Sequence, residues 1–174
     1  MKKKYPVKHK KTLKENFQHI IPEIFNDFMS FSEIVTTKPL RKDMLHQMRI
    51  AGKPLRYLME IGEKAFSDDY KKCHEEIKDM IELMGEIHDC DVMLPEIIAH
   101  LKEIRIFNCT IPVYKERIST RILRDLIREL YTNRGTMYNE MCSKMKAWEK
   151  TKFKSKLVFS MKTHPFSPGV NGGL

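Results

Sequence analysis

The chain has 174 residues, the usual size of one domain, which can bury a core without disulfide or metal cross-links. It has only seven glycines and is rich in Lys, Glu, Met, Leu and Ile, which helices tolerate or favour, so we expect an all-α fold. No apolar run approaches the roughly 18 residues of a membrane span, and the four cysteines lack the paired spacing of zinc or redox sites. These features argue against a membrane partner and favour a cytoplasmic protein with reduced thiols.

Helical spacing of apolar residues predicts three helices in the first part of the chain. The first covers residues 13–34, with Pro22 either kinking it or opening its main part. The second covers residues 40–65. The third covers residues 67–104 and is expected to bend at Pro95.

Two further helices complete the predicted antiparallel bundle. Thr110 and Pro112 resemble a cap followed by a first-turn proline, which begins a fourth helix that reaches Tyr131. A fifth helix follows Asn133. We therefore expect a basic flexible leader over residues 1–12 and a bundle domain over residues 13–158. The bundle has about five helices, some long and kinked at prolines. A disordered tail follows over residues 159–174.

The net charge of +9 is unevenly distributed. Residues 1–14 hold seven lysines and no acid, and residues 144–162 hold seven lysines and one acid. The remainder has 18 basic and 22 acidic residues, a balance of −4. The lysine-rich ends are either solubilising tails or arms that capture a long anion, whereas a binding surface in the core requires basic residues gathered on helix faces.

The second expected helix carries such a basic face. Steps of three and four residues place five side chains within an arc of about 80°. They are Lys42, His46, Arg49, Lys53 and Arg56. At the rise of an α-helix this row spans about 21 Å, which suits a polymeric anion with several phosphates. The alternative is that these residues are solvated or paired with acids elsewhere in the bundle.

A second row lies on the fourth expected helix. Its members are Arg117, Arg121, Arg124 and Arg128. Acids on the same helix can pair with them, so two readings stay open. The row either converges with the first row on one groove or forms a solubilising surface.

Two segments resemble the signatures of a known family. Leu45 to Tyr57 reads Leu-His-Gln-Met-Arg-Ile-Ala-Gly-Lys-Pro-Leu-Arg-Tyr, and Leu83 to Val92 reads Leu-Met-Gly-Glu-Ile-His-Asp-Cys-Asp-Val. They are similar to the signature helices of the CHAD family, the conserved histidine α-helical domain, over about residues 10–150. His88 stands where the family pattern more often has Arg or Asn.

The resemblance implies a helical domain that binds inorganic polyphosphate in a basic groove, with no catalytic residue, metal or cofactor. The implied binding residues are His46, Arg49, Lys53 and Arg56, followed by Lys42 and Arg41. The usual family domain has two similar halves and this chain has one clear copy, so the channel is either incomplete or completed by a second subunit in a homodimer. Association with polyphosphate granules would follow from such binding.

Two other functions compete with this reading. A nonspecific nucleic-acid-binding protein would use the same basic rows, although no recognition-helix motif or aromatic stacking series supports it. A phosphoryl-transfer enzyme would need a Gly-rich phosphate loop or a carboxylate cluster, and neither is evident in the sequence. We therefore expect a binding protein and not an enzyme.

Overall fold

Residues 5–162 are described by the computed structural model, and they contain helices and no strand. The α-helices are α1 (Leu13–Met29), α2 (Ser32–Thr37), α3 (Lys42–Gly62), α4 (Asp68–Thr110), α5 (Arg121–Lys150) and α6 (Phe153–Ser160). Two short 3₁₀ turns lie at Glu63–Ala65 and Tyr114–Glu116. The predicted all-α class is confirmed.

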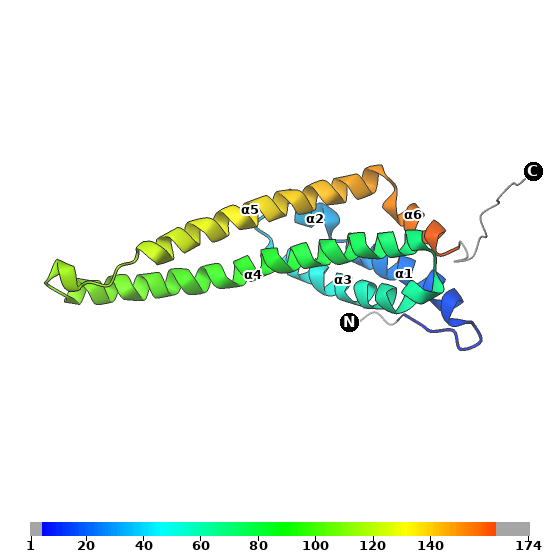
Figure 1. Ribbon diagram of the computed structural model, residues 1–174, viewed down its shortest axis with the longest axis horizontal. Coiled ribbons are helices and arrows are strands. Elements are labelled where there is room, and N and C mark those ends of the chain that lie inside the picture. The colour runs from blue at the N-terminus through cyan, green and yellow to red at the C-terminus, as the bar shows by residue number, and fades with distance from the viewer. Residues whose placement is uncertain (1–4, 163–174) are drawn as a thin grey trace, which may run out of the picture.

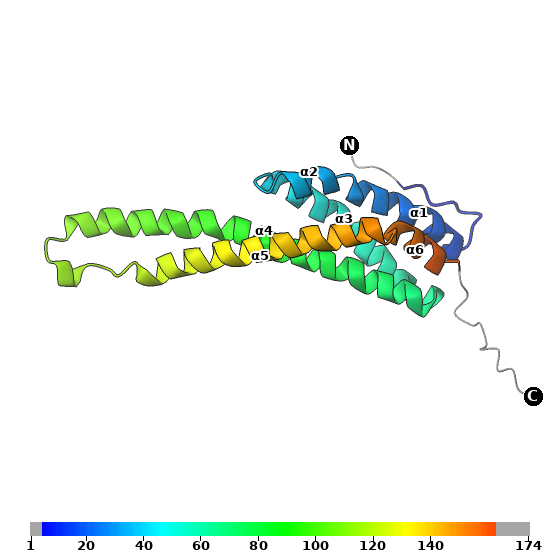
Figure 2. The same cartoon turned by 90° about the horizontal axis from the view of Figure 1, so that it is seen from above.

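The helices form a bundle from which a long helical hairpin projects (Figures 1 and 2). In the bundle, α1 packs on α3, α3 packs on the first half of α4, and α6 packs on α1, α4 and α5. The antiparallel helices α4 and α5 continue together well beyond the other helices. We call residues 98–128, which include the connection between these two helices, the stalk.

The hydrophobic core fills the bundle and largely omits the stalk. It contains fully buried side chains from α1, α3 and α4, such as Phe28, Met48 and Ile77, and from the C-terminal part of the chain, such as Phe153. Leu101 is the only buried residue among the described residues of the stalk. Apolar burial, the main favourable term in folding, is therefore concentrated in the bundle.

The first expected helix is in fact two helices. Apolar residues keep helical spacing through Ile34, but α1 ends at Met29 and α2 begins at Ser32. The hydroxyl of Ser30 donates to the backbone oxygen of Asp27 at 2.7 Å, a local bond that competes with helix continuation. Prolines do not end the helices, because α1, α3 and α4 each continue through an interior proline.

The helix boundaries predicted around the stalk were wrong. Thr110 is the last residue of α4 and opens no helix, and its hydroxyl donates to the backbone oxygen of Phe107 at 2.8 Å. The next α-helix begins only at Arg121 and runs through Asn133 without a break. Its continuity has a packing reason, since Leu130 before Asn133 and Met141, Met145 and Trp148 after it are buried on one face.

Both ends of the described chain are packed against the bundle. The Tyr5 hydroxyl donates to the carboxylate of Asp27 at 2.6 Å, so the expected flexible leader is attached from this residue onward. Met161 is fully buried, and its backbone oxygen accepts a bond from the Gln18 amide at 2.7 Å. The folded part thus includes residues 159–162 of the expected tail, and the rest of that tail lies outside the described residues.

No helix within residues 5–162 has an apolar stretch long enough to cross a lipid bilayer.

Candidate functional site

The basic row of α3 faces the neighbouring helix α4. Another face of α3 carries Met48 and Leu55, which are fully buried in the core. Gly52 brings the helix close to its neighbours, since a Cβ atom there would lie 3.0 Å from side-chain atoms of Phe28 and Ile81. This close packing sets the row beside the solvent-facing side chains of α4.

An open hollow of about 430 Å³ lies between the two helices, and we call it the α3–α4 hollow. It is lined by Arg49, Lys53, Arg56, Tyr57, Ile81, Glu82, Gly85, Glu86 and Asp89. Three of these side chains are basic and three are acidic, so the hollow is not uniformly positive. What it can bind depends on which charges are already paired.

Arg49 is the central cation of the hollow and has an unpaired donor. Its guanidinium crosses the bare backbone of Gly85, where a Cβ atom would lie 3.4 Å from the Arg49 Nε. That Nε is buried and has no hydrogen-bond partner in the described part of the chain. Arginine can only donate, and a buried donor without an acceptor costs roughly 1–3 kcal/mol. The site therefore lacks an acceptor, which an anion would supply.

Two histidines lie beside Arg49. The rings of His46 on α3 and His88 on α4 have centroids 4.5 Å apart, and the buried Nδ1 of His46 has no partner among the described residues. Burial, then the nearby His46 and Arg49, lower the pKa of His88 below its usual value, while Asp89 and Asp91 act in the opposite direction. These effects together favour the neutral form of the His88 imidazole.

The two ends of the row are already paired with acids. Lys42 lies 2.9 Å from a carboxylate oxygen of Asp91, and Arg56 lies 3.3 Å from one of Glu82. Lys42 and Arg56 are thus paired with acids on α4, which was the alternative to a role in ligand binding for residues of this row. Lys53 lines the hollow and has no ion pair among the described residues.

Arg41 does not join the row. It precedes α3 as the N-cap residue, and its guanidinium makes two bonds to the carboxylate of Asp43, at 2.7 and 2.8 Å.

Arg134 on α5, which no sequence pattern singled out, holds the acid that pairs with the first residue of the row. Its guanidinium bonds both oxygens of Asp91, at 2.6 and 3.1 Å, and the Pro39 backbone oxygen at 3.1 Å. Asp91 thus joins Arg134 and Lys42 in one cluster, although 43 residues separate it from Arg134. No local signal could reveal this pair, because it depends on how α4 and α5 pack.

The second arginine row is divided and lies in the stalk, away from the α3–α4 hollow (Figure 1). Arg117 is in the connection before α5, not on a helix, and its Nε donates to the Ile111 backbone oxygen at 3.1 Å. Arg121 and Arg128 share Asp125, at 3.8 and 3.2 Å, and their side chains are 83% and 77% exposed. Arg124 lines a different hollow at the stalk tip. The two basic rows therefore do not converge on one groove.

Metal binding has no support within residues 5–162, where no three His, Cys, Asp or Glu side chains are grouped to hold an ion.

Comparison with protein families gives a match to the CHAD domain over residues 8–96. The matched segment contains α1, α2, α3 and α4 as far as the base of the stalk, and so includes every residue that lines the α3–α4 hollow. It does not include the stalk tip or α5. No curated protein matches the chain, and no solved structure does.

Proposed function

Because this chain belongs to the CHAD domain family, we propose that it binds inorganic polyphosphate in the α3–α4 hollow through His46, Arg49 and Lys53. One observation carries this proposal: the buried Nε of Arg49, which lines the hollow, and the buried Nδ1 of His46, three residues earlier on α3, have no partner in the described chain. Phosphate oxygens are acceptors, and charge-assisted bonds to a guanidinium are among the strongest that proteins make. A phosphate group would therefore complete the hydrogen bonding of the site.

A chain of phosphates suits the site better than a single phosphate. The row from Lys42 to Arg56 is about 21 Å long, so several phosphates can contact it at once. Arg49 supplies a planar fork of donors near its centre and Lys53 supplies a mobile point charge. The paired residues Lys42 and Arg56 would exchange their carboxylates for phosphate oxygens at the ends.

The acids of the hollow favour a ligand that makes many contacts. Glu82, Glu86 and Asp89 repel any anion that enters. A single phosphate would gain little net attraction, whereas a chain sums several contacts and offsets the repulsion. Binding should therefore strengthen with chain length.

We assign binding and not catalysis to this site. Added Mg²⁺ with long-chain polyphosphate should release no orthophosphate, and steady release would replace the binding role with an enzymatic one.

A homodimer that brings two hollows together would extend the channel, and a doubled mass on sedimentation with polyphosphate would support it. Enrichment of the protein at polyphosphate granules is the corresponding expectation in cells.

The test is binding of labelled long-chain polyphosphate to the full chain at about 0.15 M salt, which screens loose surface attraction. We expect Arg49→Ala/Lys53→Ala to weaken binding by at least about tenfold. The matched control is Arg121→Ala/Arg128→Ala, which removes the same charge from exposed side chains. Duplex DNA should compete poorly.

Equal loss in the two double variants would leave only general charge attraction and would overturn the assigned site. Displacement of polyphosphate by equivalent amounts of duplex DNA would favour nonspecific nucleic-acid binding.

A further inference from the structure

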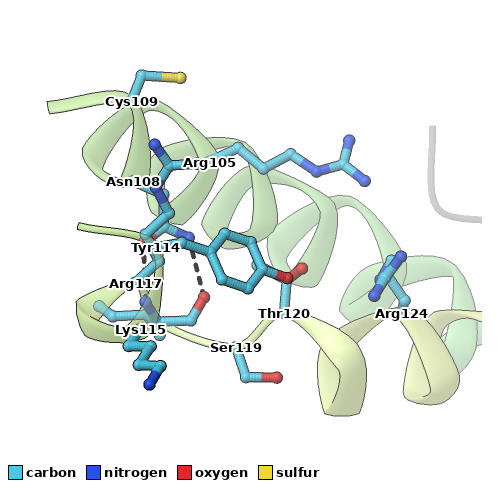
Figure 3. Close-up of a pocket in the computed structure, with 10 residues that line it drawn as sticks. Arg105, Asn108, Cys109, Tyr114, Lys115, Arg117, Ser119, Thr120 and Arg124 are labelled. Atoms are coloured by element: carbon cyan, nitrogen blue, oxygen red, sulfur yellow. Dashed lines mark hydrogen bonds between the residues drawn. The ribbon is translucent and has the colours of Figure 1, made fainter. Parts of the chain in front are cut away.

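A second hollow lies at the tip of the stalk, with a volume of about 630 Å³ (Figure 3). We call it the tip hollow. Its lining comes from the end of α4, the connection and the start of α5, and consists of Arg105, Asn108, Cys109, Tyr114, Lys115, Arg117, Ile118, Ser119, Thr120 and Arg124. Four of these residues are basic and none is acidic, in contrast to the α3–α4 hollow.

The connection that shapes this hollow is held in place by side chains. The Asn108 amide donates to the Ile118 backbone oxygen at 2.9 Å, and its carbonyl oxygen accepts from the Ile118 backbone N–H at 2.8 Å. Arg117 bonds the Ile111 backbone oxygen at 3.1 Å and lies beside the Tyr114 ring, 5.8 Å from its centroid. These contacts tie the connection to the end of α4 and preserve the shape of the hollow.

The positive charge of the tip hollow is not neutralised. Arg105 projects from α4, Arg124 projects from α5, and Lys115 and Arg117 lie on the connection (Figure 3). Within residues 5–162 none of the four has a carboxylate at ion-pair distance, whereas Arg121 and Arg128 on the same stalk share Asp125. Arg105 and Arg124 extend toward the same side of the hollow in Figure 3, and a multiply charged anion between these two like charges would relieve their repulsion.

Other groups around the hollow also suit a phosphorylated ligand. Ser119 and Thr120 supply hydroxyl groups at the start of α5, where the first backbone N–H groups of the helix lack intrahelical partners. The Tyr114 ring is 81% exposed and offers a surface on which a planar base can stack.

We infer that the tip hollow is a second ligand site, which binds a short chain of phosphates between Arg105 and Arg124. An inorganic triphosphate and the triphosphate of a nucleotide share this chemistry. Arg105 lies twenty residues beyond Gly85 on α4, about 30 Å along the helix, so the two hollows are separate. The tip hollow is also outside the matched family segment, and its role does not depend on the function proposed for the α3–α4 hollow.

The experiment is calorimetric titration of inorganic triphosphate into the full chain carrying Arg49→Ala/Lys53→Ala, at about 0.15 M salt, so that the α3–α4 hollow does not contribute. We expect saturable binding that Arg105→Ala/Arg124→Ala weakens at least about tenfold. Arg121→Ala/Arg128→Ala removes the same charge from the same stalk outside the hollow and should change affinity less than about twofold. Circular dichroism of each variant verifies that the helices are retained.

A parallel titration with ATP distinguishes the two ligand sources. Equal affinity for ATP and inorganic triphosphate assigns the site to the phosphate chain. If ATP binds more tightly than inorganic triphosphate, and Tyr114→Ala lowers the affinity for ATP to that for inorganic triphosphate, the site is assigned to a nucleotide. The inference is overturned if triphosphate does not bind, or if both arginine pairs lower the affinity equally. Loss of long-chain polyphosphate binding at the α3–α4 hollow would leave these results unchanged, so the two proposals can fail separately.

Discussion

The imidazole rings of His46 and His88 have centroids 4.5 Å apart, and the charges that act on His88 include those of Arg49, Asp89 and Asp91. Two imidazolium ions at this separation beside a guanidinium would repel each other, which agrees with the lowered pKa of His88. Negative charge beside His88 would instead favour its imidazolium. A bound phosphate chain would provide that charge.

Polyphosphate binding should accordingly strengthen as the pH falls. In the free protein His88 has a pKa below its ordinary value of about 6.5, and a bound anion raises that pKa because it favours the imidazolium. Protons are then taken up on binding, and affinity rises as the pH drops through this range. We expect His88→Asn to flatten the dependence, as measured by affinity between about pH 5.5 and 8. An unchanged pH slope in that variant would exclude His88 as the coupled group.

Removal of one acid from the α3–α4 hollow should tighten polyphosphate binding. Glu86→Gln keeps the shape of the side chain and removes a negative charge that repels the ligand. We expect a gain of about two- to tenfold at low salt that shrinks as salt screens the charge. Glu129→Gln makes the same change on the exposed face of α5 and serves as the control. An equal gain in both variants would show that only net charge matters.

Asp91 should contribute strongly to stability. Its side chain is 5% exposed and balances Arg134, which is 12% exposed, as well as Lys42. Asp91→Ala leaves the buried guanidinium without its partner, and we expect a loss of about 3–5 kcal/mol in the free energy of unfolding measured with urea. The exposed pair of Arg41 and Asp43 is the comparison, where Asp43→Ala should cost much less stability because solvent screens the pair. Similar losses in both variants would contradict the role of the buried pair.

Two glycines inside helices should respond in opposite directions to alanine. A Cβ atom at Gly52 would lie 3.0 Å from Phe28 and Ile81, so Gly52→Ala should destabilise the protein by about 1–3 kcal/mol. Nothing lies within 4 Å of a Cβ atom at Gly135, so Gly135→Ala should stabilise it by about 0.5–1 kcal/mol through helix propensity. Thermal unfolding monitored by circular dichroism measures both. A gain at Gly52 would show that the contact between α3 and α4 is looser than this packing implies.

Local periodicity was enough to predict the all-α class and the basic face of α3. A helix is predicted where apolar residues recur every three to four positions along one stretch of chain. The angle between two side chains on that helix follows from the difference between their residue numbers. The row from Lys42 to Arg56 therefore lies on α3 as expected. The signature segments likewise indicated the family, because they are continuous in the sequence.

Tertiary packing decided which of those charges remain free. The pairs Lys42–Asp91 and Arg56–Glu82 join residues on different helices, and Asp91–Arg134 joins residues 43 positions apart, so no local pattern contains them. The sequence alone determined the helical class and the basic face of α3. Only the tertiary structure determined which faces meet, because pairing depends on distances in space and not along the chain. It thereby determined that Arg49 Nε has no partner within residues 5–162 and that the stalk arginines lie far from the α3–α4 hollow.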